Sequence, residues 1–467
     1  MPSKQAQAPF ARGHLSRILG LGFGFAVIFG GTVGVGILRL PGEIAGTLGS
    51  PGLIMAVWVL GGAYSLLGAI SLAEMSAALP EAGGFYVFSK RAFGPGAGFA
   101  VGWADWMINC TSIAYAARAV SEYLAALTPA PAGIGAALQT AIALGVLALF
   151  CGLHWFGLRL SSGIQKAAST VTAITFVALA AMCFLHGKAA TGVAEVSHRP
   201  SHSAGSLGLL MPIVTSIIAV LPAIVVAYDG WYEAIYFAEE DTNAARHLPR
   251  AMIGSVLLIT GLYLLMNLSF LHVLPIAQLG QSQLAAADAA RVVFPAPKGF
   301  PNLSGEFVTV LSLLTLLSLI NALLLGAPRI LFAVGRDGLF PNAASVARGG
   351  TPRTALLVTA GMIAAIILSG KFDEIVAVAA ILMVVTYCVN YVAVFVLRAR
   401  EPELPRPFRA WGYPVTTGIV LLGSVAFLIA DVHQDPLTAL RAAVLLGIAV
   451  PVYWWRRWRM REDRTSE

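Results

Sequence analysis

Two apolar stretches of the sequence contain residues whose types and spacing could form a binding site. The first contains four closely spaced glycines, Gly30, Gly31, Gly34 and Gly36. The second, LPAIVVAYDGWYEAIYFAEE, places Asp229 and Gly230 near its middle. Each glycine costs a helix about 1 kcal/mol relative to alanine, and a charged side chain deep in a membrane is more costly still. Both stretches therefore need an explanation beyond helix propensity.

The four glycines predict a helix that is broken near its middle. Its outer half would begin near Gly34, Val35 and Gly36 with free N–H groups at its positive end, and its inner half would end in free carbonyls. Such a pair binds an anion on one side and a cation on the other, which are the two charges of a zwitterionic amino acid. The alternative is a packing face, since Gly30 and Gly34 are four residues apart. This stretch alone does not decide between them.

The composition indicates an integral membrane protein. The 467 residues are 58% hydrophobic and 11% charged, whereas soluble domains average about 25% charged residues. The formal net charge of +7 could point to nucleic acid, but 22 of the 30 Lys and Arg fall in segments that would share one side of a membrane. This bias predicts that both termini are cytoplasmic in a multi-pass protein of the inner (cytoplasmic) membrane, with no nucleic-acid partner.

Hydrophobic segments long enough to cross a bilayer predict an all-α membrane fold with about twelve transmembrane helices. The expected spans lie near residues 18–46, 52–80, 97–125, 135–154, 162–186, 211–239, 250–274, 306–334, 354–370, 374–398, 413–431 and 438–455. Short helices are expected within 79–95 and over 282–294, and Gly370 to Asp373 should separate spans nine and ten. Asp105, between two tryptophans, is expected near the cytoplasmic interface.

The two anomalous stretches fall in spans one and six. Interrupted segments at matching positions of two halves indicate an inverted-repeat transporter, which favours a substrate site over packing glycines. The predicted divisions are a cytoplasmic tail at 1–17, a first repeat at 18–186, a second repeat at 187–398, a cytoplasmic linker with spans eleven and twelve at 399–455, and a basic cytoplasmic tail at 456–467.

Other classes of protein lack support in the sequence. No GxxxxGK[ST], HExxH or GxSxG motif is present, and the four cysteines lack the CxxC spacing of zinc sites. The sequence therefore predicts neither an enzyme nor a metal or cofactor site. The few charges within the spans also do not predict the charged rings of a channel.

Several segments resemble the amino acid–polyamine–organocation (APC) permeases. GTVGVGILRLPG (31–42) resembles the break in that family's first helix, and AYDGWYEAIYFAEEDTNAARHLPRAM (227–252) is similar to the sixth-helix signature of the L-type amino acid transporters and their bacterial relatives. Further likeness occurs in residues 71–88, 321–341 and 406–414. The resemblance implies a five-plus-five inverted repeat with broken helices one and six, which transports amino acids by alternating access.

The resemblance also implies roles for individual residues. The amides of Gly34, Val35 and Gly36 would bind the substrate carboxylate, and the carbonyls of Thr32, Val226 and Asp229 would accept from its ammonium group. Many relatives carry a bulky aromatic residue at the position of Val226, so here the pocket would be wider, or Tyr228 or Trp231 would close it instead.

Energy coupling is left open by a second departure from the family. Thr172 stands where many relatives have a lysine, seven residues after Gln165. A sodium ion held by Thr172, Ser318 and free carbonyls, a proton carried by Asp229, or uncoupled exchange could replace it. Asp229 is more readily interpreted as a static, hydrogen-bonded carboxylate than as a proton carrier.

The preferred hypothesis is an exchanger or facilitator of neutral amino acids. The alternative is proton- or sodium-coupled symport of amino acids or a related amine. The partners expected are the amino acid and the lipid bilayer, and the sequence gives no sign of an accessory subunit.

Overall fold

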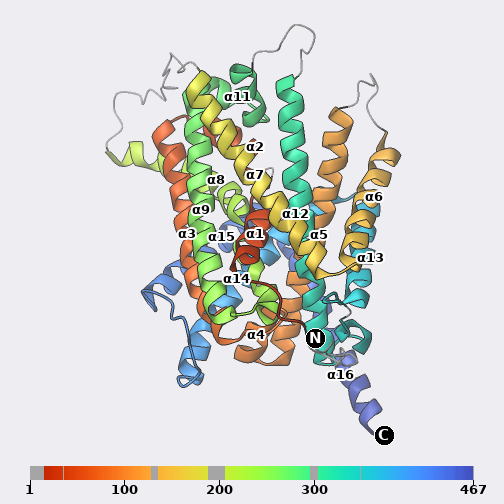
Figure 1. The fold of residues 1–467 in the computed structure, drawn as a ribbon. Helices are drawn as coiled ribbons and strands as arrows, with labels where there is room; N and C mark the ends of the chain where they lie inside the picture. Colours follow the sequence, from red (N-terminus) through yellow and green to blue (C-terminus); the bar gives the residue numbers. More distant parts are fainter. Residues whose placement is uncertain are drawn as a thin grey trace, which may run out of the picture.

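The chain folds as a bundle of long α-helices (Figure 1). The computed structural model describes residues 15–34, 36–127, 135–187, 206–294, 303–347 and 349–465. Over these ranges it has sixteen α-helices, two short 3-10 helices and one isolated parallel bridge, between Leu19 and Asp241. The predicted all-α fold is confirmed.

The first seven helices are α1 (Leu21–Thr32), α2 (Gly36–Leu48), α3 (Pro51–Ala78), α4 (Phe85–Phe93), α5 (Pro95–Ala126), α6 (Ala136–Trp155) and α7 (Leu158–His186). They are followed by α8 (Ser206–Tyr228), the 3-10 helix η1 (Glu233–Glu240), α9 (Ala244–Val273), α10 (Ile276–Leu279), α11 (Ala285–Val293) and α12 (Leu303–Arg336). The chain continues with the 3-10 helix η2 (Asn342–Ser345), α13 (Arg353–Ser369), α14 (Phe372–Arg400), α15 (Val415–Gln434) and α16 (Pro436–Thr465).

Most of the predicted spans correspond to helices that can cross a membrane. In the described part of the chain nine segments are long and apolar enough, one of them combining α8 with η1, and the bent pair α1 and α2 makes a tenth. The two remaining spans were predicted where α5 and α13 lie. The helix α5 carries the ionisable residues Asp105, Arg118 and Glu122, and α13 is 17 residues long. These two spans, and thus the total of twelve, stay predictions.

The first helix lies at the centre of the bundle, where it packs against α7, α9 and α12 (Figure 1). Around this group, α3 packs on α9 and α5 packs on α12 and α14. The short helix α4 and the C-terminal end of α16 lie at one end of the bundle, and α11 lies at the other (Figure 1). The short helices α4 and α11 thus lie at opposite ends of the bundle (Figure 1).

Local sequence signals set several boundaries correctly. The short helices expected within 79–95 and over 282–294 are α4 and α11. Gly370, at φ +67°, ends α13 in the left-handed conformation that glycine adopts most readily, so α14 begins at Phe372. Pro51 and Pro95 occupy the first helical positions of α3 and α5, where the missing N–H group costs nothing.

Asp105 is not at the interface where the sequence analysis placed it. Its side chain is buried, and Oδ1 accepts a hydrogen bond from Tyr236 of η1 at 2.7 Å. The expectation was wrong because α5 runs through the interior of the bundle, against α12 and α14, so a residue two to three turns from its start is already covered by neighbouring helices.

The segment before α1 is attached to the end of η1. The N–H groups of Ile18 and Leu19 donate to the carbonyl of Glu240 at 2.9 and 3.0 Å, and Thr242 N–H donates to the carbonyl of Leu19 at 2.9 Å. Beside this contact, Glu240 forms an ion pair with Arg329 of α12, and both side chains are almost fully buried. One small region therefore joins α1, η1 and α12.

The buried ion pair leads to a stability prediction. Arg329→Met should lower the free energy of unfolding by about 3–5 kcal/mol, because it leaves the Glu240 carboxylate buried without its partner. The matched control is Arg91→Met. Arg91 pairs with Glu401 at 2.8 Å but its side chain is 53% exposed, so the loss there should be at most about 1 kcal/mol.

Thermal unfolding of the purified protein in detergent, followed by tryptophan fluorescence, compares the two variants. Equal shifts in Tm would show that the Glu240–Arg329 pair does not hold the bundle together.

Candidate functional site

The first helix is broken where the glycines predicted it. The helix α1 ends at Thr32, α2 begins at Gly36, and their axes are bent by 46°. The Val33 N–H donates to the carbonyl of Phe29 at 2.8 Å, and the Gly34 N–H donates to that of Thr32 at 3.0 Å. Val35 lies outside the described residues. The predicted break is confirmed, and it places the N-terminus of α2 beside the C-terminus of α1.

The sixth span also loses its α-helical form near Asp229. The helix α8 ends at Tyr228, residues 229–232 form turns, and η1 continues from Glu233. Gly230 has φ +106°, which favours glycine strongly over any residue with a side chain. A Cβ atom at Gly230 would lie 2.6 Å from the carbonyl oxygen of Gly31. The two interruptions therefore meet backbone to backbone.

A tyrosine that the sequence analysis did not consider bridges these two interruptions. The Tyr263 hydroxyl, from α9, lies 2.9 Å from the carbonyl oxygen of Ala227 and 3.3 Å from that of Thr32, and donates toward both. The Thr32 carbonyl, predicted to accept from a substrate ammonium, thus faces both this hydroxyl and the Gly34 N–H. To bind the substrate as predicted, the Thr32 carbonyl must accept a hydrogen bond from an ammonium group, either in addition to these two donors or in place of one of them.

The aromatic residues near Asp229 are closely packed. The Asp229 carboxylate accepts hydrogen bonds from the Tyr387 hydroxyl and from the Gly230 N–H. The ring of Trp231 lies 5.8 Å from that of Tyr387, centroid to centroid, and Trp231 is buried. Tyr228 is also buried, and its hydroxyl donates to the carbonyl of Trp58 in α3 at 2.9 Å. Tyr228 thus faces α3, and Trp231 packs between Tyr387 of α14 and Gly68 of α3.

Val226 differs from its neighbours in being 54% exposed. Atoms of the described residues therefore leave much of this side chain uncovered. That the side chain of a substrate packs against Val226 stays a prediction.

The residues predicted for coupling are divided between two environments. Ser318 of α12 lies 3.1 Å from Nε2 of Gln165, which also donates to the carbonyl of Ala26 in α1 at 3.1 Å. Oε1 of Gln165 accepts from Asn321 at 2.7 Å. The hydroxyl of Thr172 is buried and has no hydrogen-bond partner among the described residues. The neutral amide of Gln165 thus joins α1, α7 and α12. The binding of a cation by Thr172 and Ser318 stays a prediction.

Gly30 provides the space for this amide, since a Cβ atom there would lie 1.9 Å from Nε2 of Gln165. The packing interpretation of the glycines therefore holds for Gly30, while Gly34 and Gly36 have no such close neighbour. The glycine run thus combines a packing position with a helix break.

Glu233 is a buried acid that the sequence analysis did not consider. Glu233, the first residue of η1, is 1% exposed, and in the described part of the chain its Oε2 has no hydrogen-bond partner. The rule that singled out Asp229, a charged residue in the middle of a predicted span, applied equally to Glu233.

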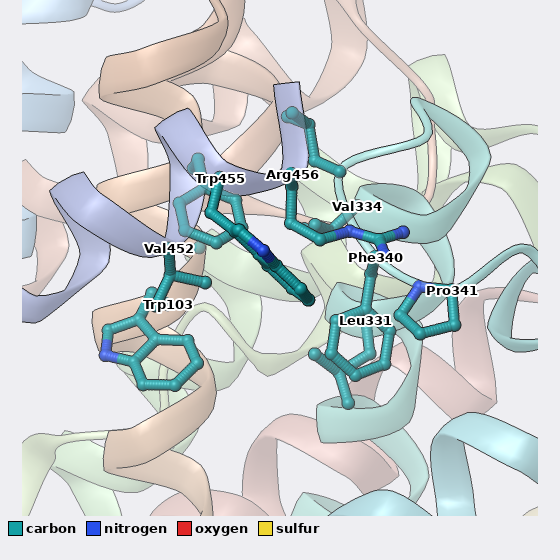
Figure 2. A pocket seen from close by; sticks show the side chains of 11 residues that line it. Trp103, Leu331, Val334, Phe340, Pro341, Val452, Trp455 and Arg456 are labelled. Carbon is teal, nitrogen blue, oxygen red and sulfur yellow. The ribbon is translucent and has the colours of Figure 1, made fainter. Parts of the chain in front are cut away.

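A separate cavity of about 220 Å³ lies between α5, α12 and α16, away from both interruptions (Figure 2). Trp103, Leu331, Phe340 and Trp455 form much of its apolar wall, with Arg456 beside them (Figure 2). None of the predicted site residues lines it. The cavity is therefore distinct from the candidate substrate site.

The bundle and its paired interruptions define a multi-pass membrane protein with unwound backbone held inside the protein, as in secondary transporters. The profile of the amino acid permease family matches residues 23–447. The chain belongs to this family of APC transporters, as the sequence resemblance predicted, and not to an enzyme family.

The chain is similar along most of its length to characterised transporters. It is 24% identical over 448 residues to the serine/threonine exchanger SteT of Bacillus subtilis (strain 168), covering 94% of this chain and 97% of that protein. It is 27% identical over 456 residues to the human Asc-type amino acid transporter 1, covering 95% and 83% of the two chains. The human b(0,+)-type amino acid transporter 1 is 26% identical over 446 residues, covering 93% and 86%.

The geometry of the first break yields a prediction about Gly34 and Gly36. Replacing either with valine should lower amino acid uptake at least about tenfold. The β-branched side chain crowds the backbone that approaches the carboxylate, and losing one hydrogen bond to a charged group costs about 1.5–3 kcal/mol. The nearest atoms to a Cβ lie 3.8 Å away at Gly34 and 3.5 Å away at Gly36, so the variants should still fold. Uptake into proteoliposomes and elution from size-exclusion chromatography measure the two effects.

Gly22→Val is the matched control, because Gly22 lies in α1 and a Cβ there would meet nothing within 4 Å. It should transport like the parent protein. Normal uptake by both Gly34→Val and Gly36→Val would remove the first break from the substrate site.

Proposed function

We propose that this protein exchanges or facilitates the movement of neutral amino acids across the cytoplasmic membrane by alternating access. The observation that carries the proposal is the close approach of two backbone interruptions, one between Thr32 and Gly36 and one at residues 229–232, through Gly31 and Gly230. The N-terminus of α2 carries partial positive charge, and the neighbouring C-terminus of α1 carries partial negative charge. These charges match the carboxylate and the ammonium group of an amino acid.

The relatives support the same function. The printed names of SteT and of the two human proteins describe an amino acid exchanger and amino acid transporters. The bacterial relative supports a place in the cytoplasmic membrane. We place both termini in the cytoplasm because of the predominance of basic residues in the connecting segments assigned to that side.

In this proposal, spans one to five and six to ten form the inverted repeats, within 18–186 and 187–398. The carboxylate of the substrate binds to the amides of Gly34, Val35 and Gly36. Its ammonium group faces the carbonyls of Thr32, Val226 and Asp229. Trp231 and Tyr228 support the unwound segment, Trp231 through α14 and α3 and Tyr228 through α3.

Uptake by purified protein in liposomes, with a panel of labelled amino acids, tests the function. We expect uptake of neutral amino acids that rises when unlabelled amino acid is present inside. We expect no accumulation driven by a sodium gradient alone, because the position between α1, α7 and α12 is already occupied by the Gln165 amide.

Uphill accumulation on a sodium gradient would contradict this expectation and support symport. In that case Thr172→Lys should abolish the accumulation if the ion binds beside α7. Thr170→Lys is the matched control, because Thr170 lies on the same helix but is exposed.

The exposure of Val226 leads to a prediction about specificity. Val226→Phe should reduce transport of bulky amino acids relative to small ones, by about 10- to 200-fold if the ring fills the pocket. Val214→Phe is the control, since Val214 is 46% exposed on the same helix, far from the interruption. Competition by unlabelled amino acids of increasing size measures the change, and an unaltered profile would place residue 226 outside the site.

A further inference from the structure

We propose that the carboxyl group of Glu233 is a proton-binding site that is used in the transport cycle. In the arrangement described here Glu233 holds a proton, and it releases this proton to water when the path toward the cytoplasm opens. The proposal rests on the proposed transport of amino acids and adds a titrating group to it.

The first observation is the position of Glu233 between α1 and α12. Each of these helices has a glycine where it faces the Glu233 side chain. A Cβ atom at Gly31, in the last turn of α1, would lie 2.6 Å from Cγ of Glu233. A Cβ atom at Gly326, in α12, would lie 3.4 Å from Oε2. The carboxyl group thus occupies space left by two glycines, at the contact between the inner half of the first helix and α12.

The second observation is that this carboxyl group is buried and incompletely satisfied. Glu233 is 1% exposed, and within the described ranges its Oε2 meets no hydrogen-bond donor and its carboxyl group forms no ion pair. An ionised carboxylate without partners is very costly to bury, whereas its protonated form carries no net charge. One proton is sufficient to remove this cost.

The surrounding groups make a negative charge on Glu233 still less favourable. Asp105 of α5 and Asp229 of the turn lie close enough to interact with it electrostatically. The hydroxyl of Tyr236 donates to Asp105 and that of Tyr387 to Asp229, while Tyr232 lies beside Asp229. Arg329, the buried cation of α12, is bound to Glu240. Within the described ranges, the charged groups that act on Glu233 are thus the acids Asp105 and Asp229, with no cation to offset them.

The position of Glu233 connects its proton to movement of the transporter. Glu233 begins η1, and the other end of η1 is bound to residues 18 and 19 ahead of α1. If η1 and the inner half of α1 move away from α5 and α12, water reaches the carboxyl group and accepts its proton. When these elements close again, the carboxylate must take a proton back from water or be buried with its charge. Closing should therefore be slow when Glu233 is ionised.

Exchange of labelled for unlabelled amino acid in proteoliposomes, at equal pH on both faces, tests the proposal. Wild-type exchange should decrease at alkaline pH, approaching about tenfold per pH unit beyond the midpoint, the slope of a single titrating group. Glu233→Gln resembles the neutral form in shape and charge, so its exchange should stay nearly constant over the same range.

Glu306→Gln is the matched control, because Glu306 is an exposed acid at the start of α12, and it should keep the wild-type pH profile. If Glu233→Gln does not fold, Asp105→Asn provides a second test. Removing this neighbouring acid favours ionisation of Glu233, so the midpoint should move to lower pH.

An identical alkaline decrease in Glu233→Gln and wild type would overturn the proposal, as would wild-type exchange that does not change with pH. Recovery of wild-type exchange at alkaline pH on adding sodium would show a metal cation in place of the proton, and would overturn it too. If the wild type exchanges no amino acid at any pH, the proposed function fails and this inference fails with it.

Discussion

The close backbone contact between Gly31 and Gly230 is the constraint on which the rest of the site depends. Gly230 adopts φ +106° and approaches the carbonyl of Gly31 so closely that a side chain would clash. Within a membrane protein, backbone that leaves the helix must find partners inside the protein. Tyr263 supplies one such partner to both interruptions. The unwound segments are thus held in place by protein groups, with their polar ends facing each other.

The inner half of the first helix is attached to its surroundings by two different kinds of contact. Gln165 and Ser169 of α7 donate to the carbonyl of Ala26, and Gln165 also contacts Ser318 of α12. These neutral hydrogen bonds contribute modestly, about 1 kcal/mol each. Contacts to the end of η1 are made instead through the backbone of residues 18 and 19. The inner half of the first helix is thus held to α7 by weak side-chain hydrogen bonds and to η1 by backbone hydrogen bonds. This arrangement suits a helix that moves together with η1.

The sequence predicted the interruptions because glycine and a charged residue contradict the usual composition of a buried helix. It also predicted the short helices α4 and α11, whose boundaries depend on nearby residues. It could not predict Tyr263 or Gln165 as partners of the break, because both lie on helices distant in sequence and only the packing of those helices brings them to α1. Asp105 was misplaced for a similar reason, since its burial depends on how α5 packs against α12 and α14.

The predicted contacts of Gly34, Gly36 and Val226 with a substrate are the central claim, and a bound amino acid would test them most directly. The measurement is a cryo-electron microscopy map of the protein in lipid nanodiscs with a transported amino acid present. The account predicts density between residues 32–36 and 226–230, with the carboxylate at the N-terminus of α2. Substrate density elsewhere, such as in the cavity between α5, α12 and α16, or a first helix that runs unbroken through residues 33–35, would contradict it.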